Sequence, residues 1–362
     1  MPQVLVVGAG PVGMMLAGEL RLAGVDVTVV DRLPAPMQES RASQLNTRTA
    51  ELLHERGLDE LLAEAVHEPR SHFGGLGFDL SDVDSEFSGN WKVPQYRTEA
   101  ALTEWALGLG ATLLRGHELT GLTAHEDHVE CSFAGKPALR TDFVVGCDGQ
   151  DSDVRRLAGF VFDFVPATRE LLRADVTGID VPDRRFERFE HGMAVASTRG
   201  GVTRVMVHEF GREVTDRQPT FAEITEVWAK VTGEDIAHGT PVWVDSFDNA
   251  RGQVAEYRRG RVFLAGDAAH RHMPIGGQAL NIGLQDAVSL GHKFRPGQSL
   301  DDYHHERHPV GAKVLRYVVA QEDLLLGGPE IGPLRAVLAE LVALPPVQTH
   351  LAALLSGVRS NA

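Results

Sequence analysis

The first thirteen residues hold the feature that most constrains this chain, an apolar run that breaks into three spaced glycines. Val4–Val7 predicts a buried strand, Gly8 permits a tight turn, Gly10 lets backbone N–H groups approach a pyrophosphate, and Gly13 allows close helix packing. A second apolar strand ends at Asp31, eighteen residues past Gly13, where a carboxylate can bind a ribose hydroxyl. The pattern predicts a site for NAD, NADP or FAD. The alternative is a glycine turn that serves packing alone.

Composition limits the classes of partner. At 362 residues the chain can form two domains or one large one. Its 35 Lys and Arg against 50 Asp and Glu give a formal charge of −15, which repels nucleic-acid backbones and anionic membrane surfaces. Cys131 and Cys147 lie in strand-like apolar stretches and are expected to be inert core thiols. No run is long enough to span a bilayer, so we expect a cytoplasmic protein; the sequence leaves its oligomeric state open.

The order of predicted elements indicates an α/β (α+β) protein with two interleaved domains. Residues 1–168 and 249–299 predict one Rossmann-like nucleotide-binding domain, and residues 70–97 are assignable to either domain. Residues 169–248 predict a β-sheet substrate domain. Residues 300–362 predict a C-terminal helical segment, broken at Gly327-Gly328-Pro329 and Pro345-Pro346.

Individual elements follow from periodicity and from stop signals. The predicted helices are Thr47–Gly57, Thr98–Leu109, Phe221–Val231 and Gln278–Lys293. The predicted strands are Ala111–Leu114, Val129–Phe133, Phe143–Val145, Leu171–Thr177, Met193–Ser197, Val202–Phe210 and Val262–Ala265. Strand pairing is expected to bring residues 111–145 beside the first glycine motif.

Three later motifs make the nucleotide prediction more specific. One buried strand ends in Asp148-Gly149, and another ends in Gly266-Asp267. The third motif, Pro274–Asn281, carries two glycines into a helix. An Asp at a strand end is placed to accept sugar or ribityl hydroxyls, and a glycine-rich helix start offers N–H donors and a positive dipole to an electron-rich ring.

With these motifs the chain resembles the FAD-dependent aromatic hydroxylases similar to para-hydroxybenzoate hydroxylase. The resemblance is closest to the actinobacterial aromatic polyketide hydroxylases, which act on angucycline and anthracycline-type compounds. It runs from the GAGPVG loop through His72–Gly75, the CDG, GDAAH and GGQ-x-L-N segments, to Tyr303–Gly311.

The resemblance implies an oxidoreductase with known cofactor chemistry. NADPH or NADH would reduce FAD, O2 would add at the flavin C4a, and the hydroperoxide would hydroxylate a polycyclic aromatic polyketide. The protein would position the substrate and exclude water. The resemblance implies no dedicated catalytic acid or base, only a flavin-facing loop with Pro274, Gly276 and Gly277.

The resemblance also implies roles for matching residues. The adenosine end of FAD would contact Gly8, Gly10, Gly13, Asp31 and Arg32, and the diphosphate or ribityl region would contact Arg41 and Gln95. Asp148 belongs to a motif linked in the family to both FAD and NAD(P)H, and Asp267 to a motif that contacts the ribityl-phosphate part. The loop beside the isoalloxazine ring would comprise Pro274, Gly276, Gly277, Gln278, Ala279, Leu280 and Asn281.

Substrate residues are less constrained by the sequence. His72, Phe73 and Gly74 predict a pocket for a planar ligand, with a simple turn as the alternative, and Trp91 is a candidate for the substrate channel. No metal site is predicted, because the histidines at 304, 305 and 308 fit a solvated helix face. His270 and His272 fit hydrogen-bonded loop histidines better than catalytic ones.

The chain departs from the family pattern at several places. Ala279 replaces a glycine near the flavin, Gln150-Asp151 replaces Gly-Arg after the CDG motif, and the segment Gly291–Gln298 is short. Many members of the resembled family carry a thioredoxin-like third domain, which we expect this protein to lack. We therefore keep two alternatives. One is a Baeyer–Villiger or epoxidising enzyme on the same fold; the other is a protein without redox activity, acting as a cyclisation or dehydration enzyme or as a partner.

Overall fold

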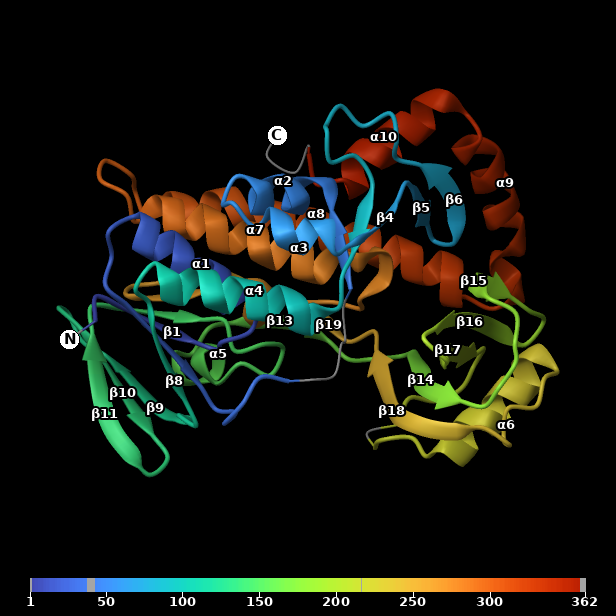
Figure 1. Ribbon diagram of the computed structural model, residues 1–362, viewed down its shortest axis with the longest axis horizontal. Coiled ribbons are helices and arrows are strands. Elements are labelled where there is room, and N and C mark those ends of the chain that lie inside the picture. Colours follow the sequence, from blue (N-terminus) through green and yellow to red (C-terminus); the bar gives the residue numbers. More distant parts are fainter. Residues whose placement is uncertain (1, 38–42, 216, 359–362) are drawn as a thin grey trace.

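The computed structural model describes residues 2–37, 43–215 and 217–358. The molecule has two halves. The first, which takes strands from both sides of residues 170–248 in the sequence, is built on a six-stranded sheet in the order β20-β21-β12-β1-β2-β8, parallel except for β20 (Figure 1). These strands are β1 (Val4–Val7), β2 (Val27–Asp31), β8 (Thr112–Arg115), β12 (Phe143–Gly146), β20 (Arg258–Arg259) and β21 (Val262–Leu264).

The strand order places the predicted motifs together. Because β1, β2, β12 and β21 are parallel neighbours, the residues that follow them lie at one edge of the sheet. The chain leaves β1 toward β2 on one side, while β12 lies on the other, which makes a topological switch point. The expected pairing of residues 111–145 with the first motif is confirmed, since β12 pairs with β1 and β8 with β2.

Helices α1 (Pro11–Leu22), α4 (Gln95–Gly108) and α7 (Gln278–Lys293) cover one face of this sheet (Figure 1). They pack closely because Gly18 of α1 lies under the Trp105 ring and Gly291 of α7 lies against Glu19. An antiparallel sheet of β9 (Leu119–Ala124), β10 (Val129–Phe133) and β11 (Lys136–Thr141) extends from the other side, next to α5 (Asp153–Leu157).

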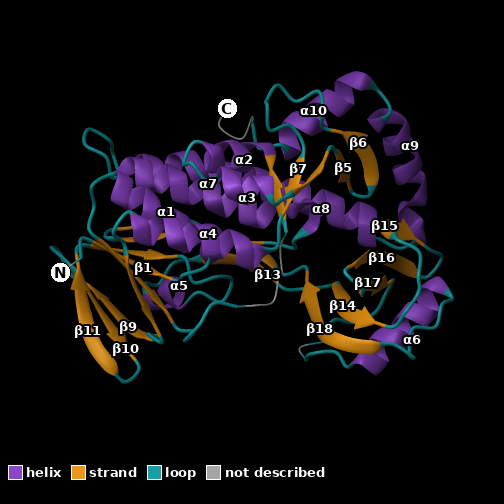
Figure 2. Ribbon diagram, in the orientation of Figure 1, coloured by secondary structure: helices purple, strands orange, loops and turns teal. Residues whose placement is uncertain are grey.

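The second half is a five-stranded antiparallel sheet in the order β15-β16-β17-β14-β18, with α6 (Phe221–Thr232) beneath it (Figure 2). The strands are β14 (Glu170–Thr177), β15 (Arg184–Arg188), β16 (Gly192–Arg199), β17 (Val202–Glu209) and β18 (Thr240–Asp248). Alternation sends Leu172 and Ala174 toward α6, while Leu171 packs with Met273 and Ile275 from the first half.

Short strands and C-terminal helices connect the two halves. β3 (Gln44–Asn46), β4 (Val66–Glu68) and β7 (Asn90–Lys92) form one small sheet, β5 (Arg70–Phe73) and β6 (Leu76–Asp79) form a hairpin, and β13 (Phe162–Val165), β19 (Arg251–Val254) and β22 (His270–Arg271) form a third sheet. The helices are α2 (Thr47–His54), α3 (Asp59–Ala63), α8 (Asp302–Leu326), α9 (Gly332–Val342) and α10 (Pro345–Leu355), with 3-10 turns η1 (Gly266–Ala268), η2 (Ile275–Gly277) and η3 (Pro329–Ile331).

The predicted elements are confirmed to within a few residues, but several observed elements were not predicted, among them α3, β9, β11 and β15. Helix α4 begins at Gln95 rather than Thr98, because Pro94 occupies the N-cap position. Strand β18 was not predicted, since Pro241 and alternating polar residues mask its pattern. Strands β5, β6 and β7, from residues 70–97, pair with none of the strands of the five-stranded sheet. The exact domain boundaries stay a prediction.

Among the described residues, no single helix is long and apolar enough to cross a membrane. Residues Pro329–Val342 and Pro345–Leu355 reach that length and composition only as a pair, with a bend of 98° between them.

Candidate cofactor and substrate site

The glycine loop after β1 is shaped by close backbone packing. Gly8 adopts φ +106°, and a Cβ there would overlap the Cys147 carbonyl group. A Cβ on Gly13 would overlap the Gly8 carbonyl oxygen, so α1 begins tightly against the turn. Gly10, in contrast, has no atom within 4 Å of a Cβ position, which leaves open space at the start of α1. This is the cradle that a pyrophosphate needs.

Asp31 closes the loop from the end of β2. Its Oδ2 accepts a hydrogen bond from the Ala9 N–H at 2.7 Å, and its Oδ1 accepts from the Leu33 N–H at 2.7 Å. Each carboxylate oxygen has a second lone pair, so a ribose hydroxyl can still be bound. Arg32 follows on an exposed side, and Arg41 lies outside the described residues.

The Gly-Asp turn presents a free carboxylate at the same sheet edge. Asp267 is solvent-exposed in η1, and it has no hydrogen-bond or ion-pair partner among the residues described. Protein surrounds it nevertheless, and this burial raises the pKa of its carboxyl group. An unpartnered carboxylate that solvent reaches is suited to accept hydrogen bonds from the hydroxyl groups of a ligand, as FAD would supply.

The Asp148 carboxylate accepts hydrogen bonds within the protein, which the sequence does not predict. It accepts hydrogen bonds from Ser152 Oγ at 2.5 Å and from the Val154 N–H at 3.1 Å, which stabilise the start of α5. Burial raises the pKa of its carboxyl group, and the hydrogen bond from Ser152 opposes that shift. Cofactor contact by this residue stays a prediction.

The charge change at Gln150-Asp151 is offset by two arginines that sequence reasoning missed. Arg271 lies 3.8 Å from Asp151, and Arg155 donates to the carbonyl oxygens of Gln150 and Ala268. A signal was available in Arg155, one helical turn past the motif. Both arginines therefore lie beside the Gly-Asp turn, where Arg271 is shared between Asp151 and Asp248.

The predicted flavin-facing loop has residues exposed to solvent and others that hydrogen bonds hold in place. Pro274 is exposed, and Gly276 and Gly277 adopt φ +70° and +67°, which favours glycine. Ala279 lies in the first turn of α7, where helical backbone tolerates a methyl group. The alanine therefore imposes no backbone strain, and like Leu280 it is half-buried.

Side chains of β3 and α7 hold this loop. Asn281 donates to the carbonyl oxygens of Gln44 and Gly277 and accepts from the Asn46 N–H. Gln278 Nε2 donates to the Gly276 carbonyl oxygen at 3.1 Å, so the side-chain amide groups of both residues donate to protein carbonyl oxygens. Gln44 also donates to the Gly276 carbonyl, a role that sequence reasoning missed.

A buried ionic cluster supports the Gly-Asp turn from behind. Asp286 accepts from His270 Nε2 at 2.6 Å, from Arg307 Nε at 2.6 Å and from the Gly266 N–H at 3.2 Å. All three side chains are almost completely buried. Burial opposes charge on Asp286, but Arg307 and His270 hold the pKa of its carboxyl group below the ordinary value. His270 thus supports the fold, as expected.

The residues predicted to bind substrate separate into two groups. His72 and the neighbouring Gly75 line a cavity of about 550 Å³, between the β5–β6 hairpin, β15 and α10. Phe73 packs instead in an apolar cluster against α9 and α10, and Gly74 lies against Leu324. Trp91 is not among the lining residues of this cavity, because its indole N–H donates to the Phe87 carbonyl and its ring packs against His67 and Phe87.

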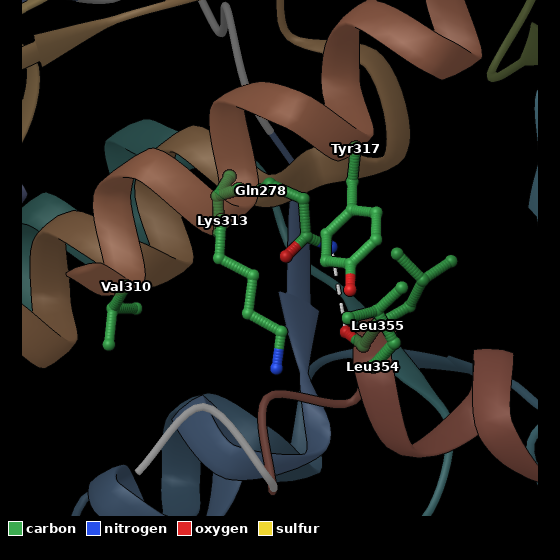
Figure 3. Close-up of a pocket in the computed structure, with 7 residues that line it drawn as sticks. Gln278, Val310, Lys313, Tyr317, Leu354 and Leu355 are labelled. Atoms are coloured by element: carbon green, nitrogen blue, oxygen red, sulfur yellow. Dashed lines mark hydrogen bonds between the residues drawn. The ribbon is translucent and has the colours of Figure 1, made fainter. Parts of the chain in front are cut away.

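The hairpin that lines this cavity contacts the flavin-facing loop through one side chain of α8. Gln321 of α8 accepts from the Gly74 N–H at 3.3 Å, and its side chain also lies against Gly276. A second pocket, of about 30 Å³, lies beside Gln278 between α8 and α10 (Figure 3). Lys313, Tyr317 and Leu355 line it, and it has room for a water molecule but not for an aromatic substrate.

Three remaining predictions concern Gln95, a metal site and the two cysteines. Gln95 begins α4 and is half-buried. Among the described residues, one group has a geometry compatible with a metal ion, His125, His128 and Glu130 on the β9–β10 hairpin, remote in sequence from every motif above. Cys131 and Cys147 are free thiols, and burial raises the pKa of both, which is consistent with inert core thiols.

Comparison with known proteins shows what binds at such a site. The FAD binding domain family matches residues 1–318. Rifampicin monooxygenase from Streptomyces venezuelae is 39% identical over 368 residues, covering 96% of this chain and 77% of its own. The crystal structure of CabE, an aromatic hydroxylase from angucycline biosynthesis, superposes with a TM-score of 0.93 at 44% identity, covering 98% of this chain and 76% of CabE.

One relative is named for a different reaction. Dialkyldecalin synthase from Streptomyces rugosporus is 35% identical and covers 98% of this chain and 80% of its own. The fold therefore extends beyond oxygenation. The family match over most of the chain nevertheless shows its family, and the open space at Gly10 and the Asp267 carboxylate fit that assignment. The chain belongs to the FAD binding domain family and is a flavin-dependent monooxygenase.

Proposed function

We propose that this enzyme hydroxylates a polycyclic aromatic polyketide, using FAD, NADPH or NADH, and O2. The observation that carries the proposal is that one sheet edge joins the open glycine cradle, the free Asp267 carboxylate and an exposed flavin-facing loop, next to a cavity of about 550 Å³. Cavities of this size accommodate drug-sized planar ligands. A cytoplasmic location fits the proposal, because NAD(P)H is supplied there.

Each part of the site has a separate task in this reaction. Gly10 and the start of α1 would hold the diphosphate, Asp31 the ribose, and Asp267 the ribityl chain. Pro274 and the glycines after it would border the isoalloxazine ring. When bound, FAD supplies the redox chemistry that amino-acid side chains lack.

The protein itself binds, orients and excludes water. Gln321 and Gln44 fix the flavin-facing loop against the cavity wall, which keeps the substrate ring at a constant distance from the cofactor site. Residues of the β5–β6 hairpin, β15 and α10 line the cavity, and a substrate that fills it would limit the entry of water to the cofactor site.

The test is a labelled turnover experiment. Protein loaded with FAD is mixed with NADPH, 18O2 and a panel of anthraquinone and angucyclinone-type compounds. We expect one product to contain a single 18O atom, with the second atom in water. A panel that is bound without 18O incorporation would contradict hydroxylation. Mass and connectivity of the product separate ring hydroxylation from Baeyer–Villiger or epoxide chemistry.

A cyclisation activity is the second candidate, because dialkyldecalin synthase is similar over 98% of this chain. It predicts a product isomeric with its substrate, formed without O2 and without NADPH consumption. Anaerobic incubation with polyene substrates therefore separates the two functions.

A further inference from the structure

The cavity under the β5–β6 hairpin carries an excess of positive charge, although the chain as a whole is strongly acidic. Arg70 and Arg185 line it, and Lys92 of β7 lies near by. Both Arg185 and Lys92 reach the same carboxylate, Glu68, at 3.8 Å. One anion shared between two cations leaves one positive charge uncompensated.

The remaining charges do not reverse this balance. Asp79 also lines the cavity and faces Arg70 across the hairpin, so these two charges cancel each other. Asp79 Oδ1 is itself bound by the Ser81 N–H at 2.7 Å. The groups around the cavity thus sum to about one positive charge, in a chain of formal charge −15.

His72 adds a neutral hydrogen-bond donor to the same cavity. It is only 7% exposed, and its ring packs against Phe186 with centroids 4.3 Å apart. Burial, and then the charges of Arg185 and Lys92, lower its pKa to about 3, so the ring is neutral at working pH.

The tautomer of His72 follows from its one protein contact. Nδ1 accepts a hydrogen bond from the Gly75 N–H at 3.2 Å, so the single proton of the neutral ring is on Nε2. Nε2 has no hydrogen-bond partner among the described residues and is not sealed from solvent. Because His72 lines the cavity, this N–H is offered to whatever enters it.

We propose that this cavity selects a polycyclic aromatic substrate that carries an anionic oxygen, a phenolate or a carboxylate. Arg185 binds the anionic oxygen, and the Nε2–H of His72 donates to a neutral carbonyl oxygen of the ring system. Phe186 and Phe78 provide apolar walls for the rings. The proposal rests on the proposed function, which it extends by naming the charge of the substrate.

The test measures binding rather than turnover, so that its failure is distinguishable from failure of the oxygenase proposal. FAD-loaded protein is titrated with anthraquinone-2-carboxylate and with the carboxamide of the same ring system. We expect the carboxylate to bind about tenfold more tightly, since a charged partner strengthens the hydrogen bond. The difference should shrink as ionic strength rises.

Three single substitutions test which residues cause the carboxylate preference. Arg185→Gln should remove the carboxylate preference and leave carboxamide binding unchanged, whereas the control Arg97→Gln, an equally exposed arginine of α4, should preserve it. His72→Phe should weaken both ligands by a similar factor. The preference should be constant between pH 5.5 and 8, because His72 stays neutral over that range.

Several outcomes would overturn the proposal. Equal affinity for the acid and the amide would exclude charge selection. An equal effect of Arg97→Gln would show a general electrostatic effect rather than a site, and no binding of either compound would exclude the cavity as a ligand site. A carboxylate preference that grows on acidification would point to a titrating histidine other than a neutral His72.

Discussion

At the scale of single residues, the three glycines of the first loop have different tasks that substitution can separate. Gly10→Ala should leave the apo protein as stable as the wild type, because its φ is −72° and no atom crowds the Cβ position. Gly13→Ala should destabilise it by about 1–3 kcal/mol through overpacking against Gly8. Both should weaken FAD binding. Urea unfolding of the apo protein and FAD titration measure the two effects; equal destabilisation would refute the division of tasks.

The free carboxylate of Asp267 allows a cleaner test of cofactor binding. Its pKa is raised by burial, so at neutral pH its charge opposes folding, and Asp267→Asn should leave apo stability unchanged or slightly higher. The same change should weaken FAD about ten- to a hundredfold, since a hydrogen bond to a charged acceptor contributes about 1.5–3 kcal/mol. Flavin fluorescence quenching measures it. Unchanged affinity would remove Asp267 from the cofactor site.

At the scale of elements, α7 and α8 are joined by the buried cluster of Asp286, Arg307 and His270. Arg307→Met leaves an uncompensated buried carboxylate and should cost about 3–5 kcal/mol of unfolding free energy. The double variant Asp286→Asn with Arg307→Met should recover much of that loss. FAD affinity should stay low in the double variant, because Asp286 also accepts from the Gly266 N–H and its replacement by Asn weakens that hydrogen bond. Full recovery of affinity in the double variant would contradict a positioning role.

Helix α8 also carries a carboxyl group whose protonation affects stability. Glu322 is 1% exposed, and Asn249, which it contacts at 3.3 Å, binds the backbone where the chain enters the five-stranded sheet. Burial raises its pKa to about 7, so the folded state holds a proton that the unfolded state releases above pH 4.5. Its stabilising contribution is therefore full below pH 4.5 and is lost as pH rises through 7.

Glu322→Gln should remove this dependence. From pH 5 to pH 8 the variant should gain up to about 3 kcal/mol relative to the wild type, the equivalent of the pKa difference. Chemical denaturation at several pH values measures the gain. Glu340→Gln, an exposed change on α9, is the matched control and should show none. A parallel shift in both variants would exclude Glu322 as the source.

At the scale of the whole molecule, the two halves are coupled through shared packing. Leu171 and Met193 of the five-stranded sheet pack with Met273 and Ile275 of the flavin-facing loop, and Arg188 donates to the carbonyl oxygens at the end of α8. The chain also crosses between the halves twice. We therefore expect the molecule to unfold as one cooperative unit.

The four tryptophans report on this coupling. Trp91 and Trp105 lie in the first half, and Trp228 and Trp243 in the second. FAD at a hundred times its Kd should raise the unfolding free energy by about 2.7 kcal/mol. When one pair of tryptophans is replaced by Phe, the fluorescence of the remaining pair should report the same rise in unfolding free energy, whichever pair remains. A shift seen only by Trp91 and Trp105 would show that the halves unfold independently.

The sequence by itself determined the local elements and the cofactor class. Apolar periodicity and spaced glycines act within about ten residues, so the Gly8–Gly13 turn and the helix Gln278–Lys293 were readable without a structure. Three such motifs in order indicated a flavin site.

Only the tertiary structure decided which side chains are free to act. Asn281 and Gln278, predicted at the cofactor, are engaged by protein, whereas Asp267 is free. Two partners of Asn281, Gln44 and Asn46, lie more than two hundred positions away in the sequence, and no local pattern marks such pairs. The charge of the substrate cavity has the same origin, since it depends on Arg185 and Lys92 sharing a single carboxylate.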